Sequence, residues 1–358
     1  MKTIILNVFI LCIFFVSQNS FADEVEFATG TYQEIIDKAK SENKTIMIDF
    51  VTDWCKWCVE TDRKVYTDPA VYSYANERQI NWKIDAEKGE GPELAKKYGV
   101  KGFPTIIFTD PSGTEIDRIY GYLPAEQFLI RMMDYNNGIN TYSFLSANLE
   151  KEPDSPQNNF LMAEKIISNG LDGDPKVYLN KAILNDPGNT LGYTDDAKFT
   201  LAYLNQSPEE LQKLLTEYPE SEKVKDGYIN LASFYEEKGE PIKTDELYTE
   251  AFSKYGISDF DLMQSYGGLL LGRAYGTMKD EKATDKDKEN AINTLNNCLK
   301  YVSGTVNEAS AYYIMSELYF QLNQLEKAEE SIDKAILVYD KKSYRDQKDK
   351  ISKQRAEK

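Results

Sequence analysis

The sequence predicts a mixed α/β domain followed by an all-α domain built from helical repeats. In the first half, short apolar runs that fit buried strands alternate with segments of helical spacing, and a hairpin comes near the end. In the second half, helices rich in Ala, Leu and Tyr carry a recurring frame of large and small residues. The chain has 358 residues, which is enough for two domains of this kind.

Composition excludes several classes of function. The hydrophobic share of 41% fits a globular protein. The net charge of −17, with no long basic block, argues against binding to nucleic acid or to an anionic membrane surface. The chain has no histidine, which excludes Ser-His-Asp and Cys-His catalysis and histidine-based metal sites. We therefore expect no bound metal and no other cofactor.

The first 22 residues differ from the rest of the chain. Lys2 supplies a short positive region, residues 4–16 are apolar except for Asn7, and Ser20-Phe21-Ala22 fits a small-x-small cleavage site. We expect residues 1–22 to be a cleaved signal peptide. The alternative is an uncleaved anchor, for which the apolar stretch is short. The mature protein is expected in the periplasm of a Gram-negative-type envelope, or secreted.

The elements of the α/β domain, expected over residues 23–140, follow in a regular order. Residues 31–43 have helical spacing, and residues 45–51 form an apolar strand that contains one acid, Asp49. The further expected elements are a helix after Cys55, a strand at 80–84, a helix at 93–98, strands at 104–108 and 115–120 around a turn at 110–113, and a closing helix at 124–133. This order indicates an α/β sheet with one antiparallel edge.

The most informative motif is the pair of cysteines in Thr52-Asp53-Trp54-Cys55-Lys56-Trp57-Cys58. It follows a buried strand and begins a helical pattern. The helix dipole and free backbone N–H groups favour a thiolate at Cys55, and Lys56 adds a positive charge. Cys58 lies one turn later, within reach of a disulfide formed by Cys55. Half of a metal site is the alternative, but the chain offers no partner ligands, so a redox pair is the better interpretation.

The order of elements around Trp54-Cys55-x-x-Cys58, together with Gly102-Phe103-Pro104-Thr105, resembles thioredoxin over residues 25–137. The resemblance is closest to secreted thioredoxin-like domains akin to the C-terminal domain of the periplasmic disulfide reductase of the DsbD type. The segment Tyr66-Thr67-Asp68-Pro69 after the cysteines is typical of that branch. A thioredoxin-like fold is therefore implied for this part of the chain.

The resemblance implies roles for three residues. Cys55 would be the exposed nucleophile and Cys58 the more buried resolving cysteine. Asp49, six residues before Cys55, matches the buried acid of the family; it would relay the proton of Cys58 with a pKa raised by burial. The alternative for Asp49 is a solvated residue at the strand end. The basic residue of the family has no clear counterpart, since Asn81 falls near its position and Lys83 lies two residues on.

The resemblance also implies a substrate-binding surface made of Trp54, Phe103 and Pro104. Pro104 matches the cis-proline of the family, which frees backbone groups for a substrate strand and keeps metal away from the cysteines. The alternative for Pro104 is an ordinary trans proline. Trp54 and Trp57 are most simply interpreted as packing residues. Trp57 departs from the Gly-Pro of thioredoxin, which leaves the direction of electron transfer open.

The second half resembles an array of about five tetratricopeptide repeats over residues 157–340, after a linker at 141–156. Copies of the frame of large and small residues occur at Tyr312, Met315, Ser316, Tyr319, Ala328, Ile332 and Ala335, at Tyr228, Leu231, Ala232, Tyr235, Tyr248 and Ala251, and at Leu271, Gly272, Tyr275, Ala291 and Leu295. Residues 279–290 are interpreted as a solvated insertion. Cys298 falls at a small position, which predicts a buried structural thiol. Residues 341–358 are interpreted as a charged C-terminal tail.

The leading functional hypothesis is a thiol–disulfide oxidoreductase that acts on protein disulfides and thiols through Cys55 and Cys58. The branch resembled suggests reduction, fed by a membrane electron donor, while the repeats recruit a protein partner. The alternative is an envelope scaffold or interaction protein in which the repeats carry the function. Lys56 and Trp57, between the cysteines, do not settle the redox potential.

Overall fold

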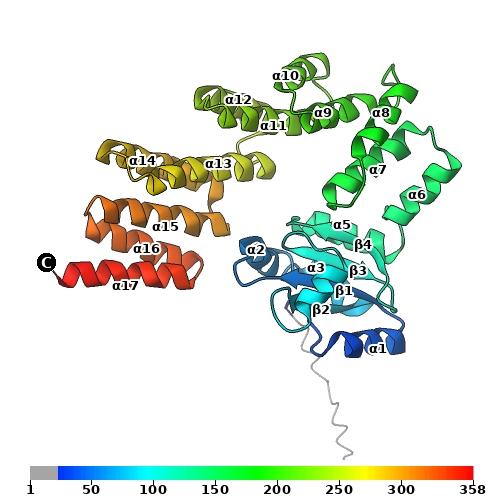
Figure 1. The fold of residues 1–358 in the computed structure, drawn as a ribbon, viewed down its shortest axis with the longest axis horizontal. Coiled ribbons are helices and arrows are strands. Elements are labelled where there is room, and N and C mark those ends of the chain that lie inside the picture. The colour runs from blue at the N-terminus through cyan, green and yellow to red at the C-terminus, as the bar shows by residue number, and fades with distance from the viewer. Residues whose placement is uncertain (1–22, 358) are drawn as a thin grey trace, which may run out of the picture.

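The computed structural model describes residues 23–357, so the predicted signal peptide at residues 1–22 lies outside the described residues. A domain with a central sheet is followed by a curved array of helices that leads away from this domain and returns to it (Figure 1). None of the helices in residues 23–357 is both long enough and apolar enough to span a bilayer.

The sheet has four strands in the order β2-β1-β3-β4. Its central strands are apolar because helices cover both faces of the sheet. β1 and β2 are parallel, whereas β3 is antiparallel to both β1 and β4, so the antiparallel part is wider than the single edge predicted from the sequence. The strands are β1 (Thr45–Val51), β2 (Gln79–Asp85), β3 (Thr105–Thr109) and β4 (Glu115–Tyr120).

Alternate residues of β1 point into two separate cores. Met47 joins a cluster with residues of α3 and α5, and Ile46 and Ile48 join a cluster with residues of α1 and α4. This is the period of two expected for a strand buried on both faces. The helices of this domain are α1 (Tyr32–Glu42), α2 (Lys56–Lys64), α3 (Pro69–Arg78), α4 (Gly91–Lys97) and α5 (Ala125–Asn136).

The helical pattern after Cys55 is divided into two helices, α2 and α3. The division occurs because the Asp68 side chain accepts hydrogen bonds from the backbone N–H groups of Ala70 and Val71, and Pro69 occupies the first position of α3. Asp followed by Pro is a strong signal for a new helix start. Helix α2 is therefore short, and its C-terminal half contacts the helical array.

The segment predicted as a linker contains a helix, α6 (Tyr142–Lys151). The Thr141 side chain caps its start, and Leu145 is buried against Met162 and Ile166 of the next helix. The linker interpretation was wrong because the two prolines that suggested it lie after the helix, at Pro153 and Pro156. The sheet domain is thus joined to the array through packed structure.

The array contains five antiparallel helix pairs among the described residues, in agreement with the number of repeats predicted (Figure 1). Small residues such as Ala232, Ala251, Ala328 and Ala335 are fully buried, because paired helices cross closely at these positions. The pairs are α7 (Pro156–Ser168) with α8 (Pro175–Asn185), α9 (Thr194–Leu204) with α10 (Pro208–Glu217), α11 (Val224–Glu237) with α12 (Pro241–Tyr255), α13 (Phe260–Lys279) with α14 (Asp285–Val302), and α15 (Val306–Gln321) with α16 (Leu325–Val338).

The fourth pair departs from the predicted frame. A Cβ atom at Gly267 would lie 2.5 Å from Val302 of α14, whereas Gly272 faces open space and Tyr275 is about half exposed. The close crossing is therefore at Gly267, and the assignment of Gly272 and Tyr275 to buried frame positions was wrong. Within the predicted solvated insertion at 279–290, residues 280–284 connect the two helices and residues 285–290 form the first part of α14. Both helices of this pair are longer than those of its neighbours, which shifts the frame.

The predicted C-terminal tail forms a helix with a buried face, α17 (Lys342–Ala356). Tyr344 and Ile351 pack with Ala328, Ile332 and other residues of the last pair. The buried face was not expected, because these apolar residues are sparse among lysines and arginines and their common face is inconspicuous in the sequence. A terminal helix that covers the last repeat is usual in such arrays.

The array contacts the sheet domain a first time where it begins. Asp117 of β4 is buried and accepts hydrogen bonds from the side chain of Asn169 (2.5 Å) and from the backbone N–H of Tyr142 (2.8 Å). The Lys165 ammonium lies 3.2 Å from the same carboxylate and is also buried. Removing one partner from such a buried network is costly, so this contact fixes the first helices of the array on the sheet domain.

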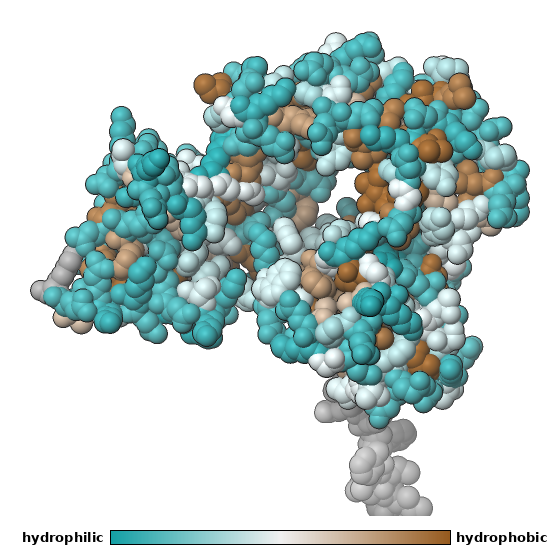
Figure 2. All heavy atoms as spheres, viewed as in Figure 1, coloured by the Kyte–Doolittle hydropathy of each residue, from teal (hydrophilic) through white to brown (hydrophobic). Residues whose placement is uncertain are grey.

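The array contacts the sheet domain a second time at its other end. The backbone N–H of Val306, at the start of α15, donates a hydrogen bond to buried Glu60 of α2 (3.1 Å). Arg63 of α2 donates to the carbonyl of Val338 (3.2 Å). Because both ends of the array touch the sheet domain, the molecule is ring-shaped, and an opening is visible between the two parts (Figure 2).

Candidate redox site

The two cysteines lie at the start of α2 and are joined by a disulfide bond. The Sγ atoms are 2.12 Å apart, and the Cα atoms are 5.3 Å apart. Cys55 is the N-cap residue, and the backbone N–H of Cys58 donates to its Sγ at 3.0 Å. In the reduced protein this N–H and the helix dipole would stabilise a thiolate at Cys55. Both cysteines are buried, at 5% and 4% exposure, so the expectation of an exposed Cys55 beside a more buried Cys58 was wrong for this disulfide-bonded form.

The loop before β3 lies beside this pair and has the conformation expected for the family. The Phe103–Pro104 peptide bond is cis. The Phe103 ring packs edge-to-face on Trp54, with 5.7 Å between the ring centroids. Trp54 is 60% exposed and its indole N–H donates to Glu87 (3.1 Å), so its packing is limited to this contact with Phe103 at the surface and it is not a core residue. An exposed tryptophan beside a cysteine pair is suited to contact a substrate.

Asp49 lies on β1, directly opposite Lys83 on β2. Its carboxyl group is 1% exposed, which excludes the solvated alternative. Burial raises the pKa of Asp49 from its ordinary value of 3.8 to about 6, and the Lys83 ammonium, 3.6 Å away, only partly opposes this. Its Oδ1 atom has no hydrogen-bond partner within residues 23–357. A carboxyl group with this pKa can accept a proton near neutral pH.

The sequence left the position of a basic partner open between Asn81 and Lys83, and in the structure it is Lys83 that pairs with Asp49. Its ammonium also pairs with Asp62 of α2, so it links the buried acid to the active-site helix. The missing signal was the register of the parallel strands: if Ile46 is paired with Ile80, then Asp49 falls opposite Lys83. Apolar patterning shows where each strand lies, but it does not give the offset between two strands that are buried on both faces.

Lys56, between the cysteines, is held by the array. Its ammonium donates to the side-chain oxygen of Asn307 on α15 (2.8 Å). Burial, and to a smaller extent the charge of Lys341, lowers the pKa of Lys56. This contact joins residues 251 positions apart, and nothing in the local sequence signals it.

A row of three aromatic rings leads from the cysteine pair to the array. Trp57 packs against Tyr122 of the loop after β4, with 5.5 Å between ring centroids. Tyr122 in turn packs against Phe260, the first residue of α13, at 6.2 Å. Trp57 therefore packs as the sequence suggested, although one member of the row comes from the repeats.

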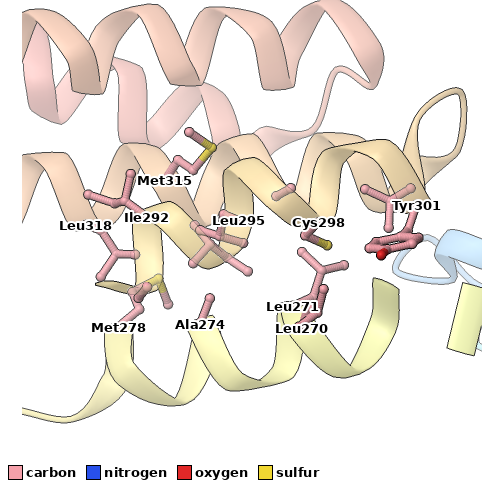
Figure 3. Close-up of a cluster of buried hydrophobic side chains, with 14 residues drawn as sticks. Leu270, Leu271, Ala274, Met278, Ile292, Leu295, Cys298, Tyr301, Met315 and Leu318 are labelled. Atoms are coloured by element: carbon pink, nitrogen blue, oxygen red, sulfur yellow. The ribbon is translucent and has the colours of Figure 1, made fainter. Parts of the chain in front are cut away.

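Cys298 has a different environment. It lies in the middle of α14 within a cluster of apolar side chains and is fully buried (Figure 3). Its thiol donates to the carbonyl of Gly267 on α13 (3.3 Å). Burial raises the pKa of this thiol to about 12. The prediction of a buried structural thiol is confirmed.

No group of three or more Cys, Asp or Glu side chains in residues 23–357 is arranged to hold a metal ion. The groups of this site that can take part in chemistry are the disulfide, the buried acid Asp49 and its partner Lys83.

Comparison with known proteins supports both parts of the chain. A model of the thioredoxin-like domain matches residues 32–136, and a model of the tetratricopeptide repeat matches residues 309–341. The thiol:disulfide interchange protein DsbD of Yersinia pestis (strain Pestoides F) is 36% identical over 94 residues, and that of Actinobacillus pleuropneumoniae serotype 5b is 38% identical over 93 residues. These matches cover 25% of this chain, which spans only 16% of the length of these curated relatives.

A solved structure of similar extent is that of a candidate disulphide isomerase from Bacteroides thetaiotaomicron. It is 35% identical, with a TM-score of 0.30, and the match covers 32% of this chain and 96% of the other.

Proposed function

We propose that this chain, which joins a thioredoxin-like domain to tetratricopeptide-like repeats, is a thiol–disulfide oxidoreductase that reduces protein disulfides through Cys55 and Cys58. The observation that carries this proposal is the geometry of the pair: Cys55 caps a helix, accepts a backbone N–H, and is bonded to a cysteine one turn along. The proposed reaction begins from the reduced form, in which both cysteines carry thiols.

In the first step the Cys55 thiolate attacks one sulfur of a substrate disulfide. A bond forms between Cys55 and that sulfur, the substrate S–S bond breaks, and the other substrate sulfur leaves as a thiolate. The helix start stabilises the attacking thiolate, because backbone N–H groups and the dipole face Cys55. The product of this step is a mixed disulfide between enzyme and substrate.

In the second step Cys58 attacks Cys55 and releases the second substrate thiol. Two electrons have then passed from the pair to the substrate, and the enzyme carries the Cys55–Cys58 disulfide seen in the structure. Cys58 must lose a proton before it attacks. We assign Asp49 as the acceptor, because it is buried and ionises with a pKa of about 6.

Trp54, Phe103 and Pro104 would form the surface that holds the substrate beside Cys55. Trp54 is exposed and packs on Phe103, and Pro104 follows Phe103 in the same loop. A substrate segment in an extended conformation could pair with this backbone, since main-chain hydrogen bonds give affinity without requiring a particular sequence.

Turnover requires that the pair be reduced again by an external dithiol. Residues 1–22 have the pattern of an export signal, so we place the protein in the periplasm or outside the cell. We propose a membrane protein with a reactive dithiol as the electron donor. The five helix pairs offer a curved surface for a protein partner, which is the usual function of such arrays.

Turnover of an insulin disulfide, with a chemical dithiol as the final reductant, tests the proposal. The wild-type protein should accelerate insulin reduction, and Cys55→Ser should abolish the acceleration. Cys298→Ala is the matched control, because it removes a thiol that lies within the array. Equal activity of wild type and Cys55→Ser would contradict the proposal and favour a scaffold in which the repeats carry the function.

A further inference from the structure

The array contacts three separate segments of the thioredoxin-like domain: the start of α2, the loop before β3 and the loop after β4. Lys56 donates a hydrogen bond of 2.8 Å to Asn307, and Lys101 donates one of 2.8 Å to Asp172. The rings of Tyr122 and Phe260 are in contact, with 6.2 Å between their centroids.

All three segments lie near the redox pair. Lys56 lies between the two cysteines in the sequence. Lys101 precedes the Phe103–Pro104 turn by two residues, and Tyr122 packs directly on Trp57. The array therefore contacts the thioredoxin-like domain at three positions near the cysteines. The redox pair lies next to the array and not on an isolated domain face.

Phe260 is the residue of the array best placed to meet a substrate. It is the first residue of α13, and the Asp259 side chain caps this helix start, which fixes the position of the ring. Phe260 is 38% exposed, although it already packs on Tyr122. Together with Trp57 and Tyr122 it forms a row of rings that begins at Trp57, the residue directly before Cys58.

We propose that this row of rings (Trp57, Tyr122 and Phe260) binds an aromatic or large apolar side chain next to the substrate cysteine, and that Phe260 lets the array select substrates. This inference rests on the proposed reductase function. The partner that fits is an extended polypeptide segment. Cys55 and Cys58 are only 5% and 4% exposed, and the array contacts three segments near them, which favours a narrow extended segment over the broad face of a folded domain.

The contact of Lys56 with Asn307 fixes this arrangement. It holds α15 against the start of α2, and α13 and α15 share one apolar cluster, so α13 is positioned with it. Phe260 is thereby presented to Tyr122 by a rigid part of the array. A free linker between the two domains would not keep a single ring in place beside the cysteines.

The experiment compares rates for two substrates of the reduced full-length protein. One is a linear peptide disulfide with Phe next to the cysteine, and the other is hydroxyethyl disulfide, which has no side chain to bind. Phe260→Ala should lower the ratio of the peptide rate to the small-disulfide rate by about tenfold, the usual effect of one lost aromatic contact. Tyr275 is an exposed residue near the other end of α13, so Tyr275→Ala should leave the ratio within about twofold of wild type.

Further substrates sharpen the result. The wild-type protein should prefer the Phe peptide to an analogue with Ser at that position, and Phe260→Ala should lose most of this preference. Phe260→Leu should keep part of it, which guards against a general folding defect in the Ala variant. A folded domain with one surface disulfide should react more slowly than the linear peptide.

Two outcomes would overturn the inference. One is an unchanged ratio in Phe260→Ala, and the other is a folded substrate that reacts as fast as the linear peptide. Either outcome, with active wild-type protein, leaves the reductase proposal intact. Failure of the wild type to reduce every disulfide offered would contradict the reductase proposal itself.

Discussion

Cys55 and Cys298 carry the same thiol in opposite environments. Cys55 caps the start of α2, where the backbone N–H of Cys58 donates to its sulfur. Cys298 lies in the middle of α14, where its own thiol donates to a carbonyl and burial raises its pKa to about 12. Both residues are almost completely buried, so exposure does not distinguish them.

The difference shows that backbone position decides what each thiol can do. The start of a helix presents unpaired N–H groups, which favour negative charge, whereas the middle of a helix presents none. In the apolar cluster around Cys298 a thiolate would lose its hydration without any compensating donor. Cys55 is thus suited to redox chemistry and Cys298 to packing.

The largest expected effect is on the rate of alkylation. In the reduced protein at pH 8, iodoacetamide should modify Cys298 about a thousandfold more slowly than Cys55, because only the thiolate reacts and a pKa of about 12 leaves little of it. Mass spectrometry of digested samples taken over time measures both rates. Comparable rates at the two sites in folded protein would contradict the proposed difference in thiolate reactivity between Cys55 and Cys298.

The next effect separates the roles within the pair. In Cys58→Ser the mixed disulfide cannot be resolved, so a disulfide-bonded peptide substrate should remain attached through Cys55. A non-reducing gel followed by mass spectrometry identifies the attachment site. Cys55→Ser should trap much less, because the remaining Cys58 lies one turn inside α2. Attachment at Cys298 would show that its burial does not protect it.

Replacement of the buried acid should slow the second step. In Asp49→Asn the release of substrate from the mixed disulfide should fall by about a hundredfold at pH 7, since a positioned proton acceptor is lost. In the wild type the rate of this release should fall as the pH falls through about 6, where Asp49 becomes protonated. Stopped-flow measurement against pH checks both statements, and a profile shared by wild type and Asp49→Asn would rule out the assigned role.

The same substitution should stabilise the fold. The pKa of Asp49 is raised from 3.8 to about 6, so the folded state favours the protonated acid, and stability is lost as the pH rises from about 4 to 6. Above pH 6 the cost reaches about 3 kcal/mol, at about 1.4 kcal/mol per pKa unit. Urea unfolding at pH 7 should show Asp49→Asn to be more stable than wild type by up to about that amount. A destabilised variant would mean that Lys83 requires the Asp49 charge.

The smallest effect concerns the thiol in the array. Cys298→Ala removes one buried sulfur and should cost about 1–2 kcal/mol of stability, because the surrounding cluster cannot fully close the space. Insulin reduction should be unchanged at temperatures where the protein is folded. Thermal unfolding and the insulin assay measure the two quantities, and a loss of turnover in folded Cys298→Ala would contradict its structural role.

Local chemistry made much of the site predictable from the sequence. The roles expected of Asp49 and Pro104 came from the resemblance to thioredoxin, whereas a cysteine pair at a helix start has a reason that spans few residues. The same holds for the repeats, whose small residues mark close helix crossings. The thioredoxin-like domain and the number of helix pairs follow from such patterns.

Contacts that depend on geometry over long distances could not be predicted. Lys83 meets Asp49 through strand register, and Asn307 meets Lys56 only because small rotations between successive repeats add up to a closed ring. The longer fourth pair shifted the close crossing from Gly272 to Gly267. The contact between the array and the redox site, such as that of Asn307 with Lys56, therefore could not be predicted from sequence patterns.

The reduction potential of the Cys55–Cys58 pair tests the proposed reductase most directly. It is measured by equilibration of the protein with dithiothreitol buffers of known ratio, with the fraction of disulfide read by mass spectrometry after alkylation. A reductase should give a value near that of thioredoxin, about −270 mV. A strongly oxidising value near about −120 mV would contradict the proposal, because such a pair gives disulfides to its substrates and does not reduce them.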